Sequence, residues 1–238
     1  MALFGGLVLF WSGAVAQTPS AAPADQASLV AEGRRLYEQS CASCHGSQGE
    51  GTADGPNLQA AGAAAADFML RTGRMPLGAP SDRPQRQPPA FGDPQIQALV
   101  AYVASLGNGS AIPNVVVDAG DITLGRSLYI QNCAACHAAT GAGDAIGGGF
   151  VAPPLNQATP EQVGEAMLTG PGSMPVFGFD QHEVDSIARY IAYLQEGKAP
   201  GGIPLGGAGP VPEGFVAVVI GAGAMLLAVR WIARGRTA

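Results

Sequence analysis

Two copies of the pattern Cys-x-x-Cys-His constrain this chain more than any other feature. They lie at residues 41–45 and 133–137 and contain all four cysteines of the 238 residues. The pattern is typical of covalent attachment of a c-type haem, in which each thiol adds to a vinyl group and the histidine lies under the iron. We therefore expect two covalently bound haem c groups. The expected attachment residues and axial histidines are Cys41, Cys44 and His45 in the first copy and Cys133, Cys136 and His137 in the second.

Other chemistries also use paired cysteines. A zinc ribbon would take four cysteines from two such pairs, but it leaves the histidine after each pair unexplained. A thioredoxin-like dithiol site requires an alternation of strands and helices that the hydrophobic pattern does not show. Plain disulfides are the third alternative. The histidines, together with downstream methionines that could ligate iron, favour haem over all three alternatives.

Each iron needs a second axial ligand, and methionine fits better than the one spare histidine, His182. Met75 and Met174 each precede a proline in a glycine-rich turn, at similar distances after their haem motifs. Turns of this kind present a thioether to iron. Met69 and Met167 lie on apolar helical stretches and are expected in the core. Histidine–methionine ligation fills both axial positions and predicts outer-sphere electron transfer.

The surroundings of the first pentad return around the second, which indicates an internal repeat. Residues 33–37 read Gly-Arg-x-Leu-Tyr, and residues 125–129 read the same. Each repeat closes with an amphipathic helix that carries a tyrosine at a matching position, Tyr102 or Tyr190. The chain therefore predicts an all-α fold of two tandem copies of one small helical domain.

The repeats differ in two connecting segments. The first repeat has a proline-rich insertion from Leu77 to Phe91, and the second has a glycine-rich stretch from Gly141 to Gly149. Both segments are expected to form loops on the surface.

Both ends of the chain are apolar. Residues 2–16 carry no charge and finish in Ala-Val-Ala, which resembles the cleavage site of an export signal. Residues 215–229 are uninterruptedly apolar, and residues 231–233 extend the stretch to about the 20 residues that a bilayer needs. Arginines cluster at its end, at Arg230, Arg234 and Arg236. The positive-inside rule then predicts a cytoplasmic C-terminus, with both haem domains on the extracytoplasmic side of the cell membrane.

These patterns predict seven consecutive segments. They are an export signal or N-terminal anchor at 1–26, haem domain one at 27–108, a linker at 109–118, haem domain two at 119–196, a Gly/Pro spacer at 197–212, a transmembrane helix at 213–233 and a cytoplasmic tail at 234–238.

Charge narrows the class of partner. The chain has 12 basic and 18 acidic residues with a single lysine, Lys198, so no basic face exists for nucleic acid. A mobile carrier commonly docks through many lysines, so the single lysine favours a tethered cytochrome. Domain one holds six basic and seven acidic residues, whereas domain two holds two and eight. The two halves are therefore expected to face different partners.

Two arginines next to Met75 are candidates to bind the haem propionates. Arg71 and Arg74 could form charge-assisted hydrogen bonds with these carboxylates. The second repeat has Leu168 and Ser173 near the corresponding positions, so solvated surface charges are the alternative.

Three further motifs carry a family resemblance. They are Thr-Gly-Arg-Met-Pro at 72–76, Met-Leu-Thr-Gly-Pro at 167–171 followed by Met-Pro at 174–175, and Gly-Pro-x-Pro-Glu-Gly at 209–214. With two haem domains, a spacer and a C-terminal helix, the chain resembles the dihaem cytochrome c subunit of the actinobacterial cytochrome bc complex, a menaquinol–cytochrome c reductase.

The resemblance implies a fold, a role and partners. The fold is two tandem class I cytochrome c domains plus a transmembrane helix. The role is that of an electron-transfer subunit without substrate chemistry of its own. Domain one would take electrons from the Rieske iron-sulfur subunit, beside a cytochrome b subunit, and domain two would pass them to a haem-copper cytochrome c oxidase. Resemblance to small c-type cytochromes further implies that the carbonyls of Pro56 and Pro153 accept a hydrogen bond from the axial histidines.

Two other functions stay open at this point. The chain could be the dihaem subunit of another membrane dehydrogenase or oxidase. It could instead be a dihaem peroxidase, which would require one iron to lose its methionine.

Overall fold

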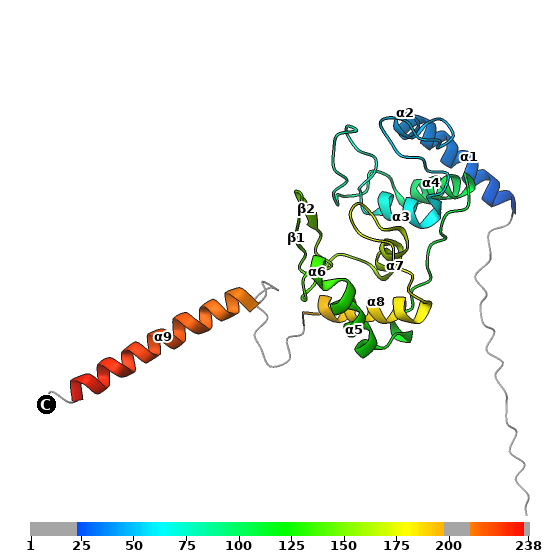
Figure 1. Ribbon diagram of the computed structural model, residues 1–238. Helices are drawn as coiled ribbons and strands as arrows, with labels where there is room; N and C mark the ends of the chain where they lie inside the picture. The colour runs from blue at the N-terminus through cyan, green and yellow to red at the C-terminus, as the bar shows by residue number, and fades with distance from the viewer. Residues whose placement is uncertain (1–22, 198–209, 236–238) are drawn as a thin grey trace, which may run out of the picture.

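The computed structural model describes residues 23–197 and 210–235, and in this range the expected pair of tandem helical domains followed by an apolar helix is confirmed (Figure 1). The expected export signal or N-terminal anchor and most of the Gly/Pro spacer lie outside the described residues. The elements are α1 (Pro23–Ser40), α2 (Ala42–His45), α3 (Gly62–Arg71), α4 (Asp93–Ser105), the 3-10 helix η1 (Val117–Ala119), α5 (Ile122–Asn132), α6 (Ala134–His137), β1 (Asp144–Gly147), β2 (Phe150–Ala152), α7 (Pro160–Thr169), α8 (Gln181–Gln195) and α9 (Pro210–Gly235).

In each domain the first long helix crosses the last one in direct backbone contact. Helix α1 packs on α4, and α5 packs on α8. The contact needs glycine, because a Cβ added to Gly33 would lie 1.9 Å from the Ala98 carbonyl oxygen and one added to Gly125 would lie 1.9 Å from that of Ser186. The shared glycine of the two repeats is therefore explained by the close approach of two helices.

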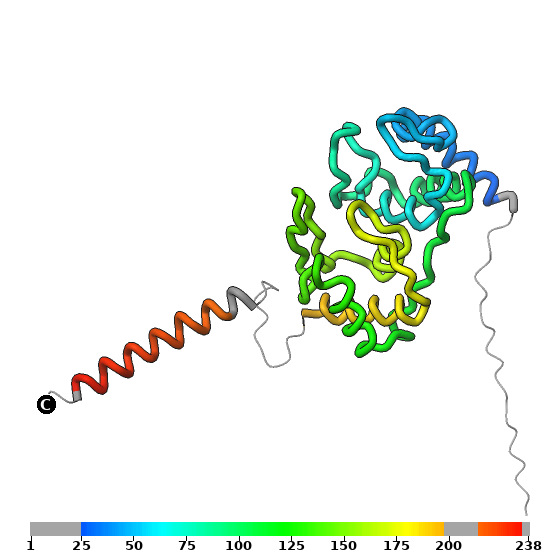
Figure 2. Tube along the Cα trace, in the orientation of Figure 1, coloured from blue at the N-terminus to red at the C-terminus, as the bar shows by residue number. Residues whose placement is uncertain are grey.

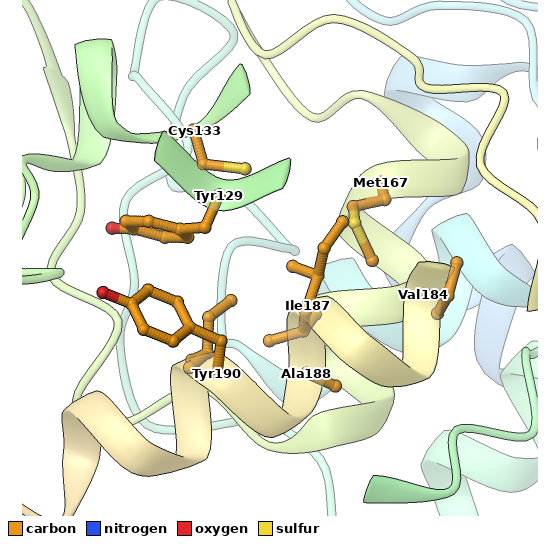
Figure 3. Close-up of a cluster of buried hydrophobic side chains, with 9 residues drawn as sticks. Tyr129, Cys133, Met167, Val184, Ile187, Ala188 and Tyr190 are labelled. Atoms are coloured by element: carbon orange, nitrogen blue, oxygen red, sulfur yellow. The ribbon is translucent and has the colours of Figure 1, made fainter. Parts of the chain in front are cut away.

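A pair of tyrosines packs beside each crossing. The rings of Tyr37 and Tyr102 lie 5.0 Å apart, and those of Tyr129 and Tyr190 lie 5.4 Å apart. Tyr37 and Tyr129 are also fully buried, and each hydroxyl donates a hydrogen bond to a carbonyl just after the Cys-x-x-Cys-His turn. Figure 3 shows the second pair within the core of domain two, next to Cys133. The tyrosines thus tie the helix crossing to the haem motif.

The glycine-rich stretch of domain two contains regular structure that the sequence pattern did not predict. Strands β1 and β2 pair antiparallel, with Asp144 opposite Ala152 and an irregularity between Ala145 and Gly147. Most residues of this hairpin are exposed, so the segment lies on the surface as expected. Positive φ angles at all three glycines of 147–149 allow the tight reversal of the chain.

The proline-rich insertion of domain one reaches across to domain two. Arg86 donates hydrogen bonds to the Gln157 carbonyl at 2.7 Å and to the Gln162 side chain at 2.8 Å. The Arg83 guanidinium lies 4.6 Å from the centre of the Phe150 ring on the hairpin. Figure 2 shows the two loops on the same side of the molecule. The insertion is a surface segment, as expected, but it also joins the domains.

Helix α9 is the one described helix that is long and apolar enough to cross a membrane. Its apolar stretch covers Gly214–Arg234, 21 residues with a mean hydropathy of 2.2. Almost all of its described side chains are exposed, with Trp231 at 78%. The helix begins at Pro210, inside the segment expected as spacer. An apolar helix that the described protein does not cover fits a membrane anchor.

The crossing at Gly125 gives a direct test of the fold. We expect Gly125→Ala to lower the free energy of unfolding by about 1–3 kcal/mol, because the new methyl group forces α5 away from α8. The measurement is thermal unfolding of the purified haem-loaded chain. Gly178→Ala is the matched control, since Gly178 has open space around it and should stay within about 0.5 kcal/mol of the wild type. Equal unfolding temperatures for both variants would contradict the close crossing.

Candidate haem sites

The two Cys-x-x-Cys-His motifs form matching helical turns. Helix α1 ends next to Cys41, and α2 follows at once; α5 and α6 repeat this arrangement at Cys133. The His45 amide donates to the Cys41 carbonyl at 3.0 Å, and the His137 amide donates to the Cys133 carbonyl at 2.9 Å. Each turn thus places both thiols and the histidine on one short helical segment. This is the local geometry that double attachment of a haem requires.

A backbone carbonyl orients each histidine ring. His45 Nδ1 lies 2.9 Å from the Pro56 carbonyl oxygen, and His137 Nδ1 lies 3.0 Å from that of Pro153. Since a carbonyl only accepts, Nδ1 donates and Nε2 carries the free lone pair that a metal ligand needs. Burial lowers the pKa of His137, while the hydrogen bond to Pro153 acts in the opposite direction. The ring is therefore neutral at physiological pH, as ligation requires.

Both candidate methionines lie against the core of their own domain. Met75 packs against the domain-one cluster that also contacts Cys41, and Met174 packs against the domain-two cluster that contains Cys133. Each is half-buried and follows a glycine with positive φ in the preceding turn. Met167, in contrast, is only 3% exposed and belongs to the core, as expected. Met69, also expected in the core, is half-buried and belongs to neither core cluster. The placement fits Met75 and Met174 as the second axial ligands.

The two arginines beside Met75 differ in their partners. Arg71 Nε lies 2.9 Å from Asp67 and its Nη1 lies 2.8 Å from Asp93, so its charge is already matched by carboxylates. The guanidinium of Arg74 lies over the Phe68 ring, and its buried Nη1 has no hydrogen-bond partner among the described residues. A buried donor without a partner fits an absent anionic group. Arg74 is therefore the better candidate for a haem propionate.

The structure disfavours the other uses of the cysteines. No disulfide joins the four cysteines, and the two pairs lie in different domains. Within residues 23–197 and 210–235, no three His, Cys, Asp or Glu side chains come together as a metal cluster. Burial raises the pKa of Cys41 and of Cys133 to about 11, whereas a dithiol redox site requires a lowered one.

One constellation between the domains escaped the sequence analysis. Helix α3 packs on α7, and this contact brings the buried carboxyl groups of Asp67 and Glu165 together. The internal repeat contained a signal for it. Met69 and Met167 are equivalent positions 98 residues apart, and Asp67 and Glu165 are separated by the same number.

Two family models match the chain, one in each domain. Residues 30–107 match the model described as cytochrome c, and residues 120–191 match that of cytochrome c oxidase, cbb3-type, subunit III. These matches confirm two tandem cytochrome c domains and, with the Cys-x-x-Cys-His motifs, two covalently bound haem c groups.

Relatives extend the comparison to nearly the whole chain. The cytochrome bc1 complex cytochrome c subunit of Mycobacterium bovis is 39% identical, over 90% of this chain and 82% of its own length. The subunit of the same name from Corynebacterium diphtheriae is 35% identical, over 91% and 86%. The cbb3-type cytochrome c oxidase subunit CcoP of an Azospirillum strain is 34% identical over smaller shares, 71% and 63%. The chain belongs to the family of cytochrome bc1 complex cytochrome c subunits and is a dihaem electron-transfer subunit.

Proposed function

We propose that this chain carries electrons from the Rieske iron-sulfur subunit of a cytochrome bc complex to a haem-copper cytochrome c oxidase. Membership in the bc1 cytochrome c subunit family supports the Rieske and cytochrome b subunits as neighbours. The observation that carries the proposal is the repetition of one complete haem cradle in a single anchored chain. Two relay centres in one chain allow an electron to enter at one domain and leave at the other, with domain one facing the Rieske subunit.

The geometry of the two motifs supports the following residues as those that would hold each haem. Cys41 and Cys44 would form the thioether bonds in domain one, and Cys133 and Cys136 would form them in domain two. His45 and His137 would ligate iron through Nε2, because the carbonyls of Pro56 and Pro153 accept the hydrogen bond from Nδ1.

Met75 and Met174 would supply the second protein ligand of each iron. When bound, each haem would supply an iron that gains and loses one electron. With a histidine and a methionine as ligands, the iron would have no open site for oxygen or peroxide. Arg74 would compensate the charge of a propionate in domain one, while Arg71 stays paired with Asp67 and Asp93.

Helix α9 anchors the chain with both haem domains outside the cytoplasm. Arg230 and Arg234 lie at the C-terminal end of its apolar stretch, and Arg236 follows. Positive charge next to a span favours the cytoplasmic side. A fluorescent protein fused after Ala238 should therefore fluoresce in whole cells, whereas alkaline phosphatase at the same point should be inactive. The reverse pair of results would contradict this orientation.

The methionine ligands can be tested one at a time. We expect Met75→Ala and Met174→Ala each to open one iron to carbon monoxide in the reduced state. We also expect each substitution to lower the potential of that haem by on the order of 100 mV, within the roughly 0.8 V that axial ligands span. Redox titration and optical spectra of the purified chain measure both effects.

Met167→Leu is the control for the methionine variants. It keeps a similar volume in the core and leaves both irons six-coordinate. Unchanged spectra and potentials in Met75→Ala and Met174→Ala would remove the ligand assignment. Carbon monoxide binding by the reduced wild-type chain would instead support a peroxidase-like open site.

The partners can be tested in membranes solubilised with a mild detergent. On a native gel stained for haem, we expect this chain to migrate with b-type haem and with a haem-copper oxidase. Deleting residues 210–238 should release the chain from that band, because the anchor is lost. Migration of the intact chain with a dehydrogenase would contradict the proposed partners and favour another membrane enzyme.

A further inference from the structure

The contact between the two domains contains a buried carboxyl group that accepts no hydrogen bond from the described residues. Glu165 on α7 is 0% exposed, and neither of its carboxyl oxygens accepts a hydrogen bond from any donor in the described part of the chain. The acidic side chain within hydrogen-bonding reach is Asp67 on α3, itself 6% exposed. Two buried carboxylates side by side repel each other, and no hydrogen bond forms between them unless one holds a proton.

The surroundings decide which carboxyl group holds that proton. Both oxygens of Asp67 lie 2.9 Å from Arg71 Nε on the next turn of its own helix. The position on α7 equivalent to Arg71 is Thr169. Its hydroxyl donates to the backbone carbonyl of Glu165 and not to the carboxyl group. The repeat thus provides Asp67 with a cation and provides Glu165 with none on its own helix. Asp67 is the carboxylate, and Glu165 is the acid.

Other charged groups near the contact are engaged elsewhere. Asp93 on α4 pairs with Arg71, and Arg86 of the insertion binds Gln157 and Gln162. Asp185 on α8 accepts hydrogen bonds from the Val116 amide and the Gln181 side chain. Glu161, one turn before Glu165, is exposed and adds a further negative charge. On the linker side, Pro113 and Val115 pack against Gly164.

We propose that Glu165 carries a proton at physiological pH and donates it in a hydrogen bond to Asp67, and that this shared proton holds the two haem domains in the arrangement used for electron transfer between them. Glu165 acts as a positioning residue. Loss of its proton places a second negative charge in the buried contact between α3 and α7 and drives the helices apart. The inference goes beyond the proposed function, because it does not depend on which proteins give or take the electrons.

The titration of Glu165 follows from its burial. Burial and, to a smaller extent, the neighbouring Asp67 together raise the pKa of Glu165 to about 9, although the positive charge of Arg71 opposes the shift. The folded chain therefore holds a proton that the unfolded chain has already released at neutral pH. Its stabilising effect is complete below the unfolded pKa of 4.5 and declines as the pH rises through about 9.

Infrared spectroscopy tests for the proton itself. In the haem-loaded full chain we expect a carbonyl stretching band of a protonated carboxylic acid that disappears as the pH is raised through about 9. The band should be lost in Glu165→Gln and kept in Glu161→Gln, which removes an exposed carboxylate from the same helix. Absence of the band in the wild type, or its persistence in Glu165→Gln, would overturn the proposal.

A second variant tests the shared proton without changing residue 165, so the result does not depend on how the Glu165 variant folds. Asp67→Asn removes the neighbouring negative charge and leaves Arg71 in place, so the infrared band should titrate at a lower pH than in the wild type. An unchanged midpoint would show that Asp67 does not share the proton.

The positioning role has a readout of its own. We expect the rate of electron transfer between the haems, measured after flash photoreduction of the purified chain, to fall several-fold as the pH rises through about 9. Glu165→Gln should match the wild-type rate at neutral pH and keep that rate in alkaline solution, because the amide donates to Asp67 without titrating. A parallel fall in both proteins would overturn the positioning role. These experiments need no partner protein, so their failure leaves the native-gel result unaffected.

Discussion

In each domain the first and last helices cross with their backbones in direct contact. This contact determines the position of the haem motif. Gly33 and Gly125 leave no room for a side chain at this crossing, and a buried tyrosine a turn further on hydrogen-bonds to the carbonyl after the pentad. Because α1 and α5 run directly into the Cys-x-x-Cys-His turns, the crossing determines where the thiols and the histidine lie relative to the core. A small domain with short helices gains through this contact a rigid base for a large cofactor.

Much of the fold and of the haem sites could be predicted from the sequence, because short patterns encode them. Each of these patterns consists of residues that are close together in the sequence. They are the pentads, the repeated Gly-Arg-x-Leu-Tyr segment and the apolar run that begins at Phe215. The hairpin at 144–152 could not be predicted, because a glycine-rich stretch gives no strand pattern. The different roles of Arg71 and Arg74 could not be predicted either, because the two carboxylates that pair with Arg71 lie on two different helices.

The division of charge between the halves also changes when the chain folds. Counted along the sequence, domain two has only two basic residues. The insertion of domain one places Arg83 and Arg86 against domain two, so its surface next to the hairpin is less acidic than the count implies. Asp67 and Glu165 illustrate the same limit. Their equivalence is visible in the repeat, but only the packing of α3 on α7 shows that equivalent residues meet.

The insertion at 77–91 has a consequence for the order in which the molecule is assembled. The core contacts of each domain close within that domain, whereas Arg83 and Arg86 bind residues 66 and 76 positions further along the chain. Neither core includes these contacts, and domains generally fold as units, so each domain can fold before the two dock. The arginines of the insertion bind domain two only when its hairpin and α7 are formed, because their acceptors lie on these two segments.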